Sequence, residues 1–191
     1  VRLFDIEDVN QSASAFNPEK LLWTNQQHII SAQAGRLGKE LVPYLRELGL
    51  DPSDGPDPAR VAEGFRERAQ TLVQMATSAR YCYVDFDAID PAVAKKHLRP
   101  VILEPLKAVR NNLAGIGEWT KEAIARVVEQ TADSFEIKMG KLGQPIRVAV
   151  TGGGVSPPID VTVYLVGRER TLRRLDHAIE IITARAASAQ S

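Results

Sequence analysis

The chain has 191 residues, of which 44% are hydrophobic and 25% charged, with 24 Lys and Arg against 24 Asp and Glu. This composition suffices for a packed core and excludes general disorder, and no apolar run approaches the roughly 18 residues of a membrane-spanning helix. The lone cysteine, Cys82, excludes an internal disulfide framework and fits a reducing cytoplasm. The mixed, acidic start argues against a signal peptide. Because the chain begins at Val1 without methionine, we expect an excised piece or a processed product.

The net charge of zero conceals a gradient along the chain. Residues 1–137 hold 16 Lys and Arg against 20 Asp and Glu, whereas residues 138–191 hold 8 against 4. A basic C-terminal third on a neutral protein predicts a local site for a polyanion, with a solvated helix face as the alternative.

Several helix starts are marked by a capping side chain that precedes a proline. Asn17–Pro18, Asp57–Pro58 and Asp90–Pro91 each place an amide or carboxylate before a residue whose missing N–H costs nothing in the first turn. Thr120 is expected to cap a fourth helix, and Ser156–Pro157 repeats the proline pattern. Apolar residues at helical spacing indicate a last helix, namely Leu172, Leu175, Ile179 and Ile182.

The sequence predicts an all-α protein of two small helical domains in series. Residues 161–166 have strand propensity, but an isolated strand leaves its backbone groups without partners, so we predict a buried helix there. The boundary is expected near residues 81–90, which gives domains of residues 1–84 and 85–191. Glycines are expected to end helices at Gly35, Gly49, Gly152 and Gly167.

No arrangement of residues that would carry catalysis is apparent. His28, His97 and His177 lie far apart, and none has a Cys or acidic partner at metal-ligand spacing. The glycines at 152–154 lack the Lys and Ser or Thr that follow in a P-loop, which favours a simple turn. We therefore predict no catalytic residue, no metal site and no cofactor in this chain, which alone should not be an enzyme.

Residues 144–175 are the most informative part of the chain, because short apolar elements alternate there with turns and arginines. Arg147 lies within the first apolar element, where it is not simply solvated, so it either meets a ligand or forms a structural ion pair. Planar guanidinium donors suit phosphates and base edges. Four more arginines follow the second apolar element, namely Arg168, Arg170, Arg173 and Arg174.

Five segments in register resemble the C-terminal half of bacterial glutamyl-tRNA synthetase. They are residues 12–25 (SASAFNPEKLLWTN), 66–72 (RERAQTL), 138–152 (KMGKLGQPIRVAVTG), 156–161 (SPPIDV) and 167–175 (GRERTLRRL). The family's catalytic Rossmann domain and two ATP-site signatures have no counterpart in these 191 residues. The resemblance implies an all-α pair of anticodon-binding domains from a cytoplasmic ligase that uses ATP and Mg to attach glutamate to its tRNA. It also implies the tRNA for glutamate as partner. From the residues themselves we expect no membrane partner and a monomer, because the apolar stripes can pair within the 191 residues.

By motif position, the resemblance also implies which residues approach the anticodon. Arg147, Ser156, Pro157 and Ile159 match residues that approach the first two anticodon bases. A helix that starts at Ser156–Pro157 is expected to present its free N-terminal N–H groups, which suit anionic or carbonyl acceptors. The chain departs from the commoner family pattern at Pro158, where glycine is frequent, and in having three glycines before this loop.

Arg68 matches the family's residue for the third anticodon base, which separates glutamate from glutamine tRNA. A guanidinium can meet the adjacent N3 and O2 acceptors of cytosine, whereas guanine presents N1–H and N2–H donors and is repelled. Packing is expected to hold Arg68, because it would border the apolar stripe of the helix after Pro58, whereas Arg66 points elsewhere. A discriminating enzyme is thus predicted, with Arg66 or Arg147 as the next candidate reader. That stripe consists of Val61, Phe65, Ala69 and Leu72.

The four arginines after Gly167 are expected to contact the tRNA backbone, because paired arginines on a C-terminal helix suit phosphate better than a base edge. Two other functions fit the same helices. A helical protein-interaction scaffold would show a repeat of fixed period, and the sequence has none. A helix-turn-helix nucleic-acid binder would need a compact basic recognition helix, which residues 167–175 imitate.

Overall fold

The computed structural model describes residues 17–86 and 88–188, and these form helices and turns with no strand. The predicted all-α fold is confirmed, as is the helix expected at residues 161–166, whose Val163 and Leu165 side chains are buried. The helices are α1 (Pro18–Ser31), α2 (Ala34–Glu47), α3 (Pro58–Phe65), α4 (Leu72–Ser78), α5 (Pro91–His97), α6 (Leu103–Gly115), α7 (Lys121–Ser134), α8 (Met139–Thr151), α9 (Ile159–Val166) and α10 (Arg168–Ser188), with 3₁₀ turns at η2 (Pro52–Asp54), η3 (Arg80–Cys82) and η4 (Pro100–Ile102).

Four of the predicted capping residues begin helices as expected. The side-chain oxygens of Asn17, Asp57, Asp90 and Thr120 each accept a hydrogen bond from a backbone N–H of the first turn, at distances of 2.8 to 3.2 Å. A cap of this kind stabilises a helix by about 1 kcal/mol.

Three of the four glycines end helices as predicted. Gly49, Gly152 and Gly167 lie just beyond α2, α8 and α9 with φ angles of 71°, 74° and 83°, a conformation that glycine adopts without strain. The prediction for Gly35 is wrong, because this residue lies in the first turn of α2. Here α1 ends before it, since the backbone of Ala32 and Gln33 is extended.

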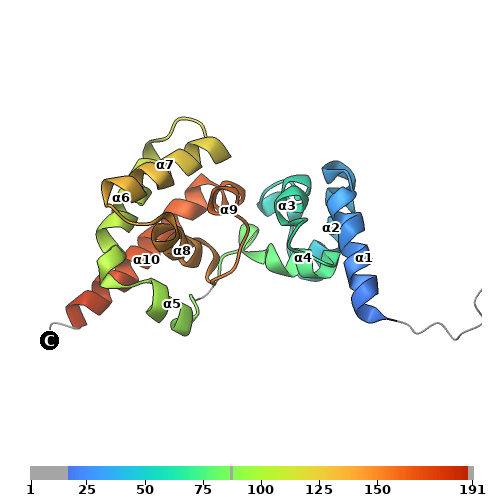
Figure 1. Ribbon diagram of the computed structural model, residues 1–191, viewed down its shortest axis with the longest axis horizontal. Helices are drawn as coiled ribbons and strands as arrows, with labels where there is room; N and C mark the ends of the chain where they lie inside the picture. Colours follow the sequence, from blue (N-terminus) through green and yellow to red (C-terminus); the bar gives the residue numbers. More distant parts are fainter. Residues whose placement is uncertain (1–16, 87, 189–191) are drawn as a thin grey trace, which may run out of the picture.

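Buried apolar residues form two cores, and Figure 1 shows the helices of each gathered at one end of the molecule. The N-terminal core takes its residues from α1 to α4 and the turn that follows, and the C-terminal core takes its residues from α5 to α10. Leu165 of α9 is the exception, because it packs into the N-terminal core. α9 therefore lies at the junction of the two cores, where it contacts α3. The predicted domain boundary between residues 84 and 85 falls between the cores and stays a prediction.

Neither a membrane helix nor a metal centre is found in the described part of the chain. No helix within residues 17–86 and 88–188 is long and apolar enough to cross a membrane. No group of three or more His, Cys, Asp and Glu side chains in the same residues is placed to hold a metal ion. The three histidines lie on α1, α5 and α10.

Cys82 lies in η3 at the edge of the N-terminal core and has no solvent exposure. Burial raises the pKa of its thiol to about 12. Because the thiolate is the reactive form, we expect the folded chain to resist alkylation by iodoacetamide at mildly alkaline pH and the urea-unfolded chain to react fully. Mass spectrometry measures the extent of alkylation. Rapid modification of the folded chain would contradict this burial.

Candidate nucleic-acid interface

Arg147 lies on α8, a helix whose other residues fill the C-terminal core, so its guanidinium lies half-buried at the edge of that core. The guanidinium donates from Nε to Ser156 Oγ at 2.7 Å, from Nη1 to Gln144 Oε1 at 2.6 Å, and from Nη2 to the Pro157 carbonyl at 3.4 Å. Among the described residues no carboxylate forms an ion pair with Arg147. Neutral oxygens therefore hold the side chain in place and leave its charge uncompensated.

The charges of Arg147 and Arg68 interact across the junction of the two cores. Desolvation by burial lowers the pKa of Arg147 most, and the positive charge of Arg68 lowers it further, while Tyr81 acts in the opposite direction. Arginine nevertheless stays protonated at neutral pH. Two like charges close together favour a ligand that supplies hydrogen-bond acceptors or negative charge.

The loop before α9 differs from the helix start predicted at Ser156 and Pro157. The helix begins at Ile159 with Pro158 at the N-cap position, so Ser156 and Pro157 precede it. The physical reason is the second proline, because a proline at 158 disfavours helical backbone at the residue before it. The expectation that a helix starts at Ser156–Pro157 and presents its free N–H groups there is therefore corrected.

Ser156 instead serves as a buried support for Arg147. Its side chain is almost fully buried, with the residue 5% exposed, and its hydroxyl donates to the Pro157 carbonyl at 3.0 Å. Ser156 Oγ also accepts from Thr162 at 2.9 Å, in addition to its bond from Arg147. Ile159 begins α9 and packs partly buried against the C-terminal core. The structure thus places Arg147, Ser156 and Pro157 in direct contact, with Ile159 two residues beyond.

Arg68 lies in a turn and is exposed, which corrects the prediction that packing along a helix holds it. Its backbone N–H bonds to the Phe65 carbonyl at 2.9 Å, because α3 ends at Phe65 and Thr71 starts a new helix by accepting a bond from Gln74 N at 3.1 Å. The apolar spacing that suggested one long helix therefore spans two short ones. No hydrogen bond or ion pair to the Arg68 guanidinium is found within the described residues, which leaves this side chain available to a ligand.

Arg66 takes the packed position that was expected of Arg68. Its guanidinium donates from Nη1 to the Ile30 carbonyl at 3.3 Å, and its Nε is buried without a partner. The side chain therefore joins α1 to the turn after α3 and is less available than Arg68 for reading a base.

A cleft of about 370 Å³ opens beside Arg68 between the two cores. Tyr164 and other apolar residues of α9 form one wall, and the cations Arg60, Arg68 and Lys121 lie around it, together with Glu63 and Glu67. The Arg60 guanidinium lies 5.7 Å from the centre of the Tyr164 ring. Aromatic rings and guanidinium planes are the usual partners of unstacked RNA bases.

The four arginines of α10 differ from the expected phosphate-binding group, because most of them bond to the protein itself. Arg174 is 5% exposed and donates to the carbonyls of Tyr81, Val84 and Val150 at 2.5 to 3.0 Å. It also donates to Asp85 Oδ1 at 3.0 Å. The expected contact of Arg174 with tRNA phosphate stays a prediction, and it would need donors that are already used inside the protein.

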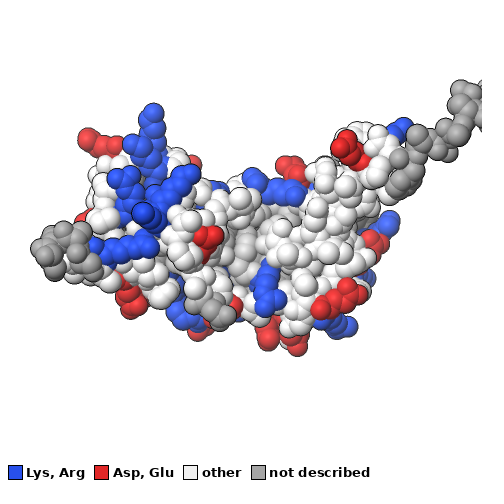
Figure 2. Space-filling model, turned by 90° about the horizontal axis from the view of Figure 1, so that it is seen from below, with Lys and Arg blue, Asp and Glu red and all other residues white. Residues whose placement is uncertain are grey.

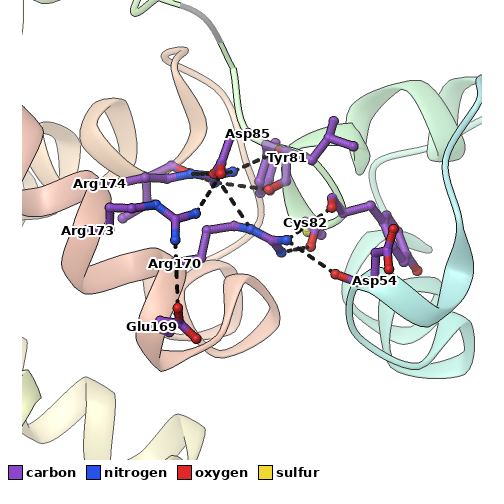
Figure 3. Close-up of polar contacts among 11 residues, drawn as sticks. Asp54, Tyr81, Cys82, Asp85, Glu169, Arg170, Arg173 and Arg174 are labelled. Carbon is purple, nitrogen blue, oxygen red and sulfur yellow. Dashed lines mark hydrogen bonds and ion pairs between the residues drawn. The ribbon is translucent and has the colours of Figure 1, made fainter.

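Arg168 and Arg170 are engaged in the same way. Arg170 donates to the carbonyls of Cys82 at 2.6 Å, Tyr83 at 3.1 Å and Asp54 at 3.2 Å, as Figure 3 shows in part. Arg168 donates to the carbonyls that follow α6 and lies 5.5 Å from the Trp119 ring centre. Turns leave such carbonyls without partners in secondary structure, and arginine satisfies several at once. The expected contact of these two residues with the tRNA backbone likewise stays a prediction.

The side chain of Arg173 is more exposed to solvent than that of Arg170 or Arg174. Its side chain is 53% exposed and donates from Nη2 to Asp85 Oδ2 at 2.6 Å, with Glu169 3.9 Å away (Figure 3). We call Asp85, Arg170, Arg173 and Arg174 the Asp85 cluster. It joins α10 of the C-terminal core to the segment that leaves the N-terminal core, and so sets how the two cores lie relative to each other.

Two residues of the site were missed in the sequence. Gln144 precedes Arg147 by three residues, a spacing that brings two side chains together on one helix face and could have identified it. Asp85 is one of several acids between residues 81 and 90, and no sequence pattern separates it from the others.

With the tRNA for glutamate as the partner that the resemblance implies, replacing Ser156 with alanine is expected to weaken binding by roughly 5- to 30-fold, because the Arg147 guanidinium loses the Ser156 Oγ acceptor that orients it. Fluorescence anisotropy with labelled glutamate tRNA measures the change. Thr183→Ala, which removes an exposed hydroxyl bonded to the Ile179 carbonyl on α10, serves as the control. An unchanged affinity in Ser156→Ala would show that Arg147 does not need this support.

Comparison with known proteins agrees with this geometry. A family model described as the anticodon binding domain matches residues 36–179. The chain is 47% identical over 187 residues to glutamate–tRNA ligase 1 of Alkalilimnicola ehrlichii, an alignment that covers 98% of this chain and 40% of that protein. The chain thus spans about two fifths of the length of this relative.

Two solved structures share the fold. A glutamate tRNA ligase from Elizabethkingia meningosepticum, in complex with its amino acid, matches 94% of this chain and 35% of its own, with a TM-score of 0.83 and 20% identity. Glutamate-tRNA synthetase from Elizabethkingia anophelis matches 93% of this chain and 34% of its own, with a TM-score of 0.77 and 21% identity.

The paired helical cores form the all-α fold that these two solved structures share. The chain belongs to the anticodon-binding domain family, whose model covers most of its length.

Proposed function

We propose that this chain recognises the anticodon of the tRNA for glutamate as part of a glutamate–tRNA ligase. The observation that carries the proposal is the junction of the two cores, where Arg147 is held by Ser156 and Gln144 beside the exposed Arg68. Both guanidinium groups lack an ion-pair partner among the described residues. The identity of 47% to a glutamate–tRNA ligase supports glutamate tRNA as the ligand.

The two arginines are assigned different tasks because they are held differently. Arg147 is fixed by three neutral acceptors, which suits contact with the first two anticodon bases alongside Pro157 and Ile159. Arg68 is exposed at the mouth of the cleft, and its donor pair matches the N3 and O2 acceptors of a third-position cytosine. A guanine at that position would place its N1–H and N2–H donors against the N–H donors of Arg68. The ligase would therefore discriminate against glutamine tRNA.

We assign the chemistry of aminoacylation to the rest of the ligase. ATP and Mg would bind there, because the sequence of this chain has no P-loop or ATP-site signature and the described residues include no metal-binding group. We further propose that the ligase works in the cytoplasm and that this chain binds tRNA as a monomer.

A salt-dependent gel shift with glutamate tRNA and with duplex DNA tests the proposal against its alternatives. We expect the tRNA to bind and the duplex to bind weakly. Equal binding of both would favour a helix-turn-helix protein, although the arginines of residues 167–175 are largely engaged within the fold. Binding of neither nucleic acid would favour a protein-interaction scaffold.

A further inference from the structure

Cations without acidic partners gather on one face of the C-terminal core. Lys95 and Lys96 of α5, Arg99 beyond it, and Lys138 and Lys141 at the start of α8 are all exposed. Among the described residues none of these five forms an ion pair, whereas cations on other helices, such as Arg36 and Lys107, do. α5 lies at the lower edge of Figure 1, and Figure 2 shows a group of Lys and Arg side chains on the face seen from below.

Three of these five cations line a cleft of about 520 Å³ between α5 and α8. Lys96, His97, Arg99 and Lys141 line it, and no Asp or Glu is among the described residues of its lining. Burial lowers the pKa of His97 most, and the positive charge of Lys96 lowers it further. α8 begins beside the cleft with no side chain capping its first amides, so the positive end of the helix dipole adds to the local potential.

The cleft adjoins one of the residues that hold Arg147 in place. Gln144 lines the cleft, accepts from Arg147 Nη1 at 2.6 Å and donates to the Gly154 carbonyl at 2.9 Å. One side chain therefore separates the cationic cleft from the guanidinium that is proposed to read the first anticodon bases. A strand of RNA whose bases meet Arg147 would continue across or beside this cleft.

We propose that the cleft between α5 and α8 binds backbone phosphates of the tRNA strand that adjoins the anticodon, which makes Lys96, Arg99 and Lys141 positioning residues for the bases. This inference rests on the proposed tRNA-binding function. Phosphate contacts hold a nucleic acid in register and carry no sequence information of their own. The side chains of this cleft, rather than those of α10, take the role of backbone contacts.

The test measures how binding of glutamate tRNA to the whole chain depends on salt. The variant carries Lys96→Ala, Arg99→Ala and Lys141→Ala, and its matched control carries Arg36→Ala, Lys39→Ala and Lys107→Ala, which removes the same charge elsewhere. Each lost phosphate contact should reduce the slope of log K against log salt by about 0.7 to 0.9 and weaken binding at about 0.1 M salt by roughly 5- to 8-fold. The cleft variant should therefore lose roughly 2 to 3 units of slope, and the control almost none.

Two further measurements separate this inference from the function on which it rests. The ratio of affinities for glutamate tRNA and for its third-base variant should stay the same in the cleft variant, because only phosphate contacts are lost. Circular dichroism and thermal melting of both triple variants should match those of the original chain. A slope unchanged from that of the original chain overturns the inference. A lack of anticodon preference in the original chain overturns the proposed function instead.

Discussion

Arg174→Ala is expected to lower the free energy of unfolding by about 2–4 kcal/mol, the largest stability loss that we expect from any single arginine of α10. The buried guanidinium satisfies the carbonyls of Tyr81, Val84 and Val150, and its removal leaves these groups without a partner and opens a cavity. For a chain of this size the midpoint of thermal unfolding should fall by roughly 4–16 °C. Thermal melting followed by circular dichroism measures the fall.

Arg173→Ala is the matched control for Arg174, because it removes the neighbouring guanidinium from the same Asp85 cluster. Its side chain is 53% exposed, and an exposed ion pair contributes less than about 1 kcal/mol. We also expect alkylation of Cys82 to accelerate in Arg174→Ala and not in Arg173→Ala. Equal stability of the two variants would mean that the hydrogen bonds from Arg174 to buried carbonyls do not hold the cores together.

Arg68→Gln is expected to abolish most of the preference for cytosine at the third anticodon position. A guanidinium can only donate hydrogen bonds, so it should favour cytosine over guanine by about 1–3 kcal/mol, or roughly 5- to 150-fold in affinity. Glutamine both donates and accepts, so it should tolerate either base. In the full ligase, the same change should admit glutamine tRNA as a substrate.

Arg66→Gln is the matched control, because it changes an arginine two residues away that is bonded to the Ile30 carbonyl. The ratio of dissociation constants for tRNAs with cytosine and guanine at the third position is the measured quantity in both variants. If Arg68→Gln keeps the full preference and Arg66→Gln loses it, the reader has been assigned to the wrong arginine.

The helix starts could be predicted because their causes are local. Asn17, Asp57, Asp90 and Thr120 cap their own first turns, and glycine at 152 and 167 permits the left-handed backbone that ends a helix. Tertiary packing was not needed to identify them. The break between α3 and α4 was missed, because Val61, Phe65, Ala69 and Leu72 keep a helical spacing across it.

The roles of the arginines could not be predicted from their order in the chain. Whether a guanidinium meets a ligand or the protein depends on which unsatisfied carbonyls lie opposite it. The Cys82 carbonyl opposite Arg170 and the Tyr81 carbonyl opposite Arg174 come from residues 88 and 93 positions earlier. Arg147 could be recognised as unusual, since it lies in an apolar run. Its support by Ser156 and Gln144 appears only in the folded chain.

The most direct test of anticodon recognition is the affinity of this chain for an isolated anticodon stem-loop of glutamate tRNA. Fluorescence anisotropy would compare the native hairpin, which has cytosine at the third anticodon position, with one that has guanine there. We predict that the chain binds the native hairpin roughly 5- to 150-fold more tightly. Equal affinity for the two hairpins would contradict the assignment of the junction between the cores as an anticodon-reading site.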